Sequence, residues 1–127
     1  MLRAKVLPEV LGQIVDNEIT ACILMTIDGA LVGSAGEKDA VDHKVVGAIA
    51  SHTWGEYVHA GREEANPAGE LRTILMELEH GRLAMTLAGK TFLLCAYSGT
   101  DAPAGLLKAK VESLGTFLSA SLDQIEM

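Results

Sequence analysis

Aromatic residues are scarce in this chain: Phe, Trp and Tyr make up 4% of the 127 residues, although hydrophobic residues reach 49%. The core must therefore be built from aliphatic side chains. Basic residues are also few, with 10 Lys and Arg against 17 Asp and Glu and a formal net charge of -7. This balance argues against binding to the phosphate backbone of nucleic acids, which needs clustered Lys and Arg. It also argues against direct docking on an anionic membrane surface.

The sequence holds only two cysteines, and each lies in an apolar run, "ACILMTI" around Cys22 and "TFLLCAY" around Cys95. Buried free thiols are predicted rather than a disulfide, which fits a reducing compartment. No run is long and apolar enough to span a bilayer, and we find no signal peptide, myristoylation motif or prenylation box. We therefore expect any membrane association to be indirect.

Catalytic and phosphate-binding motifs are missing as well. The segment "GALVGSAG" contains glycines but lacks the pattern of a P-loop or a dinucleotide-binding turn. Ser34 and Ser98 have neither a nucleophile elbow nor an obvious base. His52, Glu56 and His59 have the spacing of one helical face and could bind zinc, but no fourth ligand is evident, and a solvated polar stripe is the better interpretation. We expect no enzymatic activity, no cofactor and no metal.

The pattern of apolar residues predicts eight elements in a single domain over residues 1–127. In chain order they are a helix (4–15), two strands (19–27 and 30–34), a helix (39–60), three strands (71–78, 82–87 and 91–97) and a helix that opens near Pro103 and runs to about Leu122. The pair Asp28-Gly29 is a strong hairpin signal, because it suits a tight turn. Hairpins dominate, so we predict an α/β (α+β) fold of order α-β-β-α-β-β-β-α, with a five-stranded antiparallel sheet and helices on both faces.

The helix predicted over residues 39–60, with Asp39 as its cap, is apolar on almost all sides. One face must lie on the sheet, and the second needs a partner, because an exposed apolar patch of that size would make a monomer sticky. Alternatively, loops or the terminal helices cover it. We predict that Val45 and Ile49 lie on the sheet. The predicted partner-facing residues come from this helix and from the strand 71–78, whose open edge also needs covering: Val46, Ala50, Trp54, Tyr57, Leu71, Thr73 and Leu75.

Several segments resemble the Roadblock/LC7 family, in particular its subunits in Ragulator-type complexes. The similarity is carried by "MLRAKVLPEVLGQ", "AIASHTW", "ILMELEHGRLAMT", "LLCAY" and "LLKAKVESL", and it extends over essentially the whole chain. This resemblance implies a profilin-like sandwich that dimerises. In such a dimer, the helix 39–60 and the strand 71–78 would meet their counterparts in the partner and form one continuous sheet.

The resemblance also implies a function. The chain would be a non-catalytic scaffold that pairs with a second roadblock-type protein, and its further partners would be other Ragulator subunits and Rag-type small GTPases. It would act in mTOR and MAP-kinase signalling at the cytoplasmic face of late endosomes or lysosomes, where its partners would hold it. Three alternatives stay open: a roadblock homodimer that regulates a small GTPase directly, a dynein-type light chain, and a small-ligand sensor or enzyme on a profilin-like fold.

Overall fold

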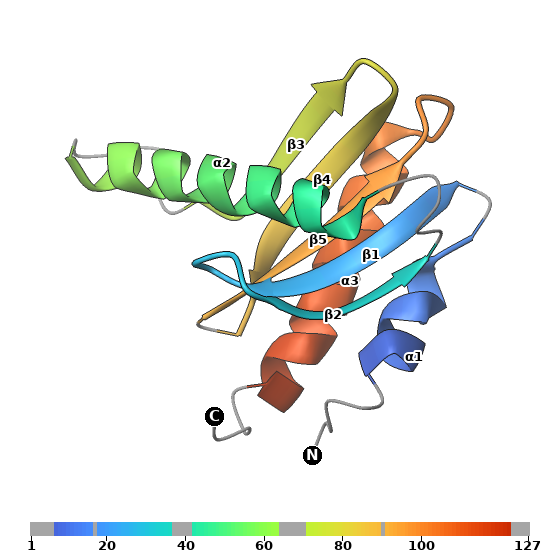
Figure 1. The fold of residues 1–127 in the computed structure, drawn as a ribbon, viewed down its shortest axis with the longest axis horizontal. Helices are drawn as coiled ribbons and strands as arrows, with labels where there is room; N and C mark the ends of the chain where they lie inside the picture. The colour runs from blue at the N-terminus through green and yellow to red at the C-terminus, as the bar shows by residue number, and fades with distance from the viewer. Residues whose placement is uncertain (1–6, 17, 37–41, 64–70, 90, 123–127) are drawn as a thin grey trace.

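In the computed structural model, helices and strands follow one another in the predicted order (Figure 1). The structure describes residues 7–16, 18–36, 42–63, 71–89 and 91–122, without the side chains of residues 59–63 and 121–122. The elements are α1 (Leu7–Leu11), the 3-10 turn η2 (Gly12–Ile14), β1 (Ile19–Thr26), β2 (Leu31–Gly36), α2 (His43–Glu63), β3 (Thr73–Leu78), β4 (Gly81–Ala88), β5 (Phe92–Ser98) and α3 (Ala104–Leu122).

The predicted boundaries differ from the observed ones by a few residues. The first helix is α-helical only from Leu7 to Leu11 and then tightens into η2, and α2 begins four residues later than predicted and ends three residues later. Pro8 is the second residue of α1. Backbone N–H groups in the first turn of a helix have no acceptor within the helix, so the N–H that Pro8 lacks costs no hydrogen bond. Residues 4–6 of the predicted first helix, and the predicted cap Asp39, lie outside the described residues.

The five strands form one antiparallel sheet in the order β2-β1-β5-β4-β3. The inner strands β1 and β5 are almost wholly buried, as expected of strands that helices cover on both faces. The β1–β2 turn forms where Asp28-Gly29 predicts it: Gly29 has a φ of 104°, and its amide donates to the Thr26 carbonyl at 3.0 Å. The edge strands are β2 and β3.

Helices on the two faces of the sheet create two separate apolar cores (Figure 1). On one face, α1 and α3 pack over the strands, and Leu11, Leu107 and Leu118 are fully buried there. On the other face lies α2, and its Trp54 packs with Met85 and neighbouring residues of the inner strands. Both cores are mainly aliphatic, as the composition predicts. None of the helices that the structure describes is long and apolar enough to cross a membrane.

An ion pair joins the segment before β1 to α3. Lys110 Nζ lies 2.6 Å from Asp16 Oδ2, and Asp16 Oδ1 accepts the backbone amides of Glu18 and Ile19, each at 2.8 Å. The hydrogen bond from Lys110, followed by those from the two amides, lowers the pKa of Asp16 to about 2. A charged contact therefore adds to the apolar packing that holds this end of the chain on α3.

Candidate protein interface

The helix α2 begins directly after Asp42, which caps it. The Asp42 carboxylate accepts the backbone amides of Lys44 at 3.0 Å and Val45 at 3.3 Å, the pattern of an N-cap residue. Farther along, the Ser51 hydroxyl donates to the Ile27 carbonyl at 2.7 Å, which ties the middle of α2 to the β1–β2 turn. These contacts, together with apolar packing, set how α2 is rotated about its axis.

The predicted rotation of α2 is wrong. Val46, Ala50 and Trp54, which we predicted to face a partner, are 7%, 0% and 2% exposed and belong to the core between α2 and the sheet. Val45 and Ile49, which we predicted on the sheet, are 53% and 38% exposed. Neighbouring residues differ by about 100° around a helix, so the two sets cannot share a face. The set that contains Trp54 packs on the sheet, because burial of this side chain removes the largest apolar area from water.

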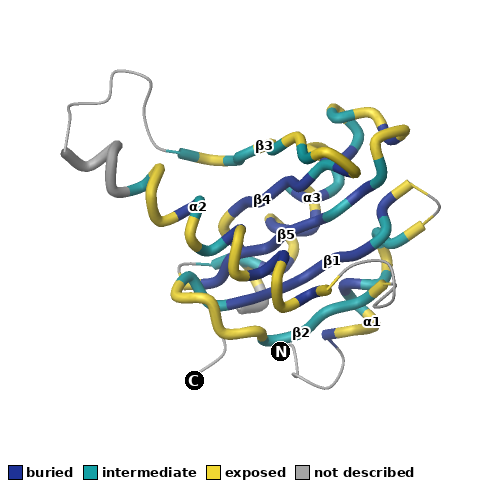
Figure 2. The backbone as a smooth tube through the Cα atoms, turned by 45° about the horizontal axis from the view of Figure 1, so that its top comes forward, coloured by how far each residue is buried: buried dark blue, intermediate teal, exposed yellow. Residues whose placement is uncertain are grey.

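Val45 and Ile49 on the outer side of α2 are exposed, and so is Tyr57 near its C-terminal end, at 60%; we call these three residues the exposed α2 surface. Tyr57 follows Trp54 by three residues and so continues the sheet-facing stripe. It is nevertheless exposed, because the C-terminal part of α2 projects beyond the strands (Figures 1 and 2). The helices α1 and α3 lie on the opposite face of the sheet (Figure 1), so they do not cover this surface.

The edge strand β3 exposes both backbone groups and side chains. In the described part of the chain it pairs only with β4, so alternate amides and carbonyls along its other side lack a strand partner. Ile74 and Met76 pack on the core beneath α2, whereas Leu75 lies on the opposite face and is 44% exposed. Leu71 and Thr73 are half-buried. Of the predicted residues, Thr73 and Leu75 lie on β3, whereas Leu71 precedes the strand and packs against the core beneath α2.

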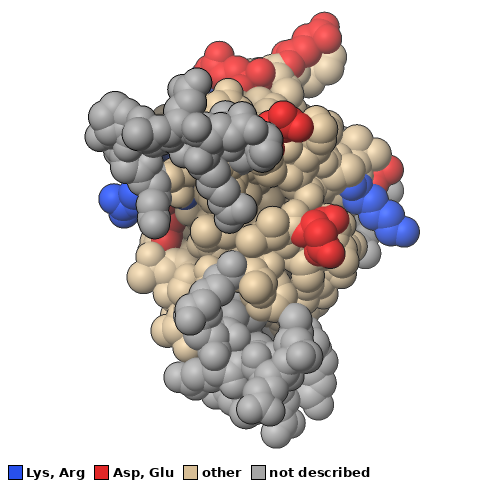
Figure 3. Space-filling view, turned by 90° about the vertical axis from the view of Figure 1, so that its left-hand side faces the viewer, with Lys and Arg blue, Asp and Glu red and all other residues tan. Residues whose placement is uncertain are grey.

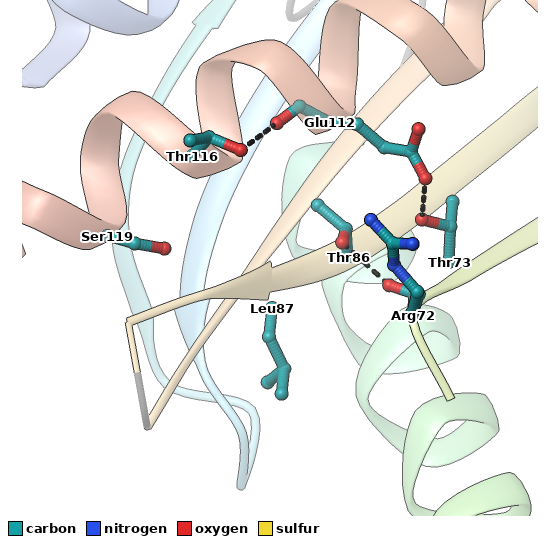
Figure 4. Close-up of a pocket in the computed structure, with 7 residues that line it drawn as sticks. All are labelled: Arg72, Thr73, Thr86, Leu87, Glu112, Thr116 and Ser119. Atoms are coloured by element: carbon teal, nitrogen blue, oxygen red, sulfur yellow. Dashed lines mark hydrogen bonds between the residues drawn. The ribbon is translucent and has the colours of Figure 1, made fainter. Parts of the chain in front are cut away.

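A polar cluster anchors the start of β3 to α3 (Figure 4). The sequence did not predict it. The Thr73 hydroxyl donates to the Glu112 carboxylate, and the Thr86 hydroxyl donates to the Arg72 carbonyl at 2.7 Å. The bond from Thr73 is the largest cause that lowers the pKa of Glu112, and Lys108 lowers it further. A cavity of about 100 Å³ opens between these residues, but both threonine hydroxyls already donate within the chain. The cluster thus acts as an anchor for β3.

The described surface around the projecting end of α2 carries few charges. Figure 3 views this side of the molecule and shows isolated carboxylates on a mostly uncharged surface, with Lys and Arg near its margins. An apolar surface of low charge beside an open strand edge is typical of sites where another protein binds.

Reactive side chains do not gather elsewhere in the described residues. His52 and Glu56 are exposed on α2, the side chain of His59 lies outside the described residues, and no three potential metal ligands cluster among those described. Cys22 and Cys95 are buried free thiols, as predicted. Burial raises the pKa of the Cys22 thiol to about 12 and also raises the pKa of Cys95. Neither sulfur is a thiolate near neutral pH, so neither can serve as a nucleophile.

Comparison with known proteins agrees with this architecture. Residues 10–98 match the sequence model of the Roadblock/LC7 domain. A Ragulator complex protein LAMTOR2 homolog from Caenorhabditis elegans is 30% identical over 119 residues, which cover 93% of this chain and 90% of that protein.

Two solved structures show the same fold at low sequence identity. MglB of Myxococcus xanthus has a TM-score of 0.82 at 14% identity and covers 100% of this chain and 97% of its own. Profilin II of Acanthamoeba castellanii has a TM-score of 0.56 at 15% identity, with 82% of this chain and 87% of its own covered. The predicted fold class, a profilin-like five-stranded antiparallel sheet with helices on both faces, is confirmed.

Proposed function

Because the chain belongs to the Roadblock/LC7 family, we propose that it is a scaffold subunit that pairs with another roadblock-type protein. The pairing would use the exposed α2 surface and the open edge of β3. Members of this family are non-catalytic adaptors and regulators, and this chain is not an enzyme. The observation that carries the proposal is an exposed apolar helix surface beside β3, whose outer edge has no partner strand in the described part of the chain.

Pairing would cover the exposed α2 surface and the open edge of β3 at the same time. A partner strand beside β3 would hydrogen bond to its open amides and carbonyls and extend the sheet. A partner helix beside α2 would remove its exposed aliphatic side chains from water, and the projecting end of α2 would lie over the partner's sheet. A specific interface buries about 800 Å² per partner, and one side of a long helix with one strand edge can supply much of that area. The proposed interface residues are Val45, Ile49, Tyr57, Leu71, Thr73 and Leu75.

The identity of 30% to the Caenorhabditis elegans LAMTOR2 homolog supports a narrower proposal. The chain, with residues 1–127 as one roadblock domain, would be a subunit of a Ragulator-type complex. That complex would help to recruit or regulate Rag-type small GTPases in mTOR and MAP-kinase signalling. Other subunits would hold the chain at the cytoplasmic face of late endosomes or lysosomes, and the chain itself would touch neither lipid nor nucleic acid.

Affinity capture of the tagged full-length chain from cells that express it tests this proposal. We expect mass spectrometry to identify a second roadblock-type protein together with other Ragulator subunits. Ile49→Asp should lose the roadblock-type protein, whereas Ala109→Asp, which adds the same charge on the exposed side of α3, should keep it. Dynein subunits in place of Ragulator subunits, or equal recovery with both variants, would contradict the proposal.

A further inference from the structure

The sheet has a second edge strand, β2, at the end opposite β3. In the described part of the chain β2 pairs only with β1, so alternate amides and carbonyls along its outer side have no strand partner. Figure 2 shows this strand at the margin of the sheet, half-buried along most of its length. The proposed pairing through α2 and β3 does not involve this edge, because the two edge strands lie at opposite ends of the sheet.

The outer edge of β2 lacks the features that usually protect an exposed strand. Natural sheets protect their edges with a charged side chain, a proline or a bulge. The strand β3 carries Glu77, but β2 contains neither a charged residue nor a proline. A bulge interrupts the pairing with β1 only near the start of β2, and residues 33–36 stay in unbroken register. Their side chains are too short to cover the backbone beside them, so this part of the edge is open to another strand.

An added strand would meet apolar neighbours on both faces of the sheet. Val32 and Ala35 are partly buried against the core beneath α1 and α3. Leu31 pairs with Met25 of the core beneath α2 and is itself 45% exposed. Side chains of the added strand would alternate between these two faces and pack beside the side chains of β2. The middle of the added strand should therefore be apolar.

Carboxylates flank β2 at both ends. Asp28 lies in the turn that precedes the strand, and Glu18 lies just before β1, at the end of the sheet where β2 finishes. Glu9 is exposed on α1, which packs on β2. Lys110 lies near the same end as Glu18, but it is already paired with Asp16. A strand with Lys or Arg on each side of its apolar middle would complement these charges.

We propose that the outer edge of β2 binds an extended segment of another protein, with an apolar middle between basic residues, as an added strand. The open backbone groups specify this occupant, because a strand presents amides and carbonyls at the spacing that an open strand edge requires. The proposal goes beyond pairing with a roadblock-type protein. It gives one chain a partner at each edge of its sheet.

A synthetic peptide of alternating Val and Thr, with a pair of Lys at each end, tests this proposal on the full-length chain. Hydrogen exchange followed by NMR reports on the amides of β2. We expect saturating peptide to slow exchange of the outward-facing amides of residues 33–36 at least about tenfold, because they gain hydrogen bonds. The same peptide with Glu in place of Lys is the matched control and should bind at least about tenfold more weakly.

Ser34→Lys supplies the charge that the edge lacks. It should weaken binding of the Lys-flanked peptide at least about tenfold and still capture the roadblock-type protein. Leu75→Lys adds the same charge on β3 and should leave protection of residues 33–36 unchanged. Circular dichroism checks that both variants are folded, and the comparison of the two peptides uses the unsubstituted chain.

Three results would overturn the proposal: no protection of residues 33–36, protection of β3 alone, or equal binding of the two peptides. Loss of the roadblock-type protein from the unsubstituted chain would instead contradict the proposed function, since that pairing uses the other edge. The two proposals can therefore fail separately.

Discussion

Ile49 and Ala50 are neighbours in the sequence but lie in opposite environments on α2. Ala50 is fully buried against the sheet, whereas Ile49 is 38% exposed on the outer side. A charge at Ala50 should therefore destabilise the fold, whereas a charge at Ile49 should disrupt pairing with a partner. Val45 and Val46 form a second such pair, 53% and 7% exposed.

We expect Ala50→Asp to unfold the chain, because an unpaired carboxylate buried in an apolar core costs on the order of 3–5 kcal/mol. Ile49→Asp should leave the fold and the melting temperature nearly unchanged but abolish pairing. Circular dichroism melts and size-exclusion chromatography with light scattering measure both effects. The reverse result would mean that α2 is rotated differently, and two harmless substitutions would mean that no partner covers α2.

The Asp16–Lys110 pair predicts a dependence of stability on pH. The pKa of Asp16 is lowered from 3.8 to about 2 in the folded chain, so the pair stabilises the fold above about pH 4, and this contribution is lost as the pH falls through about 2. Asp16→Asn should lower the melting temperature slightly at neutral pH, since the carboxylate is exposed and well solvated.

Thermal melts of Asp16→Asn and the unsubstituted chain across that pH range check this prediction. The difference between the two melting temperatures should shrink as the pH approaches 2. A difference that stays constant across the range would show that the Asp16 charge does not contribute.

At the scale of elements, the β3–β4 hairpin positions the open edge of β3. A Cβ atom on Gly81 would collide with the Ser98 carbonyl oxygen, so β5 passes too close for a side chain there. The Arg82 guanidinium holds the same end of the sheet, because it donates to the Thr100 carbonyl at 3.2 Å and also to the Ala102 carbonyl. The Arg82 side chain thus joins this end of the hairpin to the segment that follows β5.

Gly81→Ala should destabilise the chain by about 1–3 kcal/mol, because the backbone of β5 must shift to make room. Gly55→Ala is the matched control: apart from the adjoining residues and backbone of α2, no atom lies within 4 Å of its added methyl group, and Ala favours a helix over Gly by up to about 1 kcal/mol. It should therefore stabilise the chain. Urea unfolding followed by circular dichroism measures both changes. If Gly81→Ala left the free energy of unfolding unchanged, β5 would be able to make room for the methyl group at no energetic cost.

At the scale of the whole molecule, the sheet separates two cores, and each core holds one thiol. Cys22 lies in the core beneath α1 and α3, and Cys95 lies in the core beneath α2. A thiol reagent such as a disulfide dye should therefore react with neither cysteine in the native chain at neutral pH, and with both in urea. Rapid reaction of one thiol in the native chain would instead show that its core opens by itself.

Much of this architecture could be predicted because its signals are local. The apolar stripe Leu107, Val111 and Leu118 predicts α3, and Asp28-Gly29 predicts the first hairpin. The anchor of β3 had no such signal. Thr73 and Glu112 are 39 residues apart, and only packing of α3 against the sheet brings them into hydrogen-bonding distance. For the same reason the open edge could be assigned to β3 only with the family resemblance as a guide.

The type and order of the elements follow from the amino-acid sequence, because they depend on short-range patterns of residues. The tertiary structure alone decided which side of α2 is buried. A helix that is apolar around most of its circumference has no periodicity that selects one face. The selection comes from shape: Trp54 packs beside Met85 and Leu93, and Gly47 lets the Met25 side chain approach. These contacts form only when strands distant in the chain lie side by side.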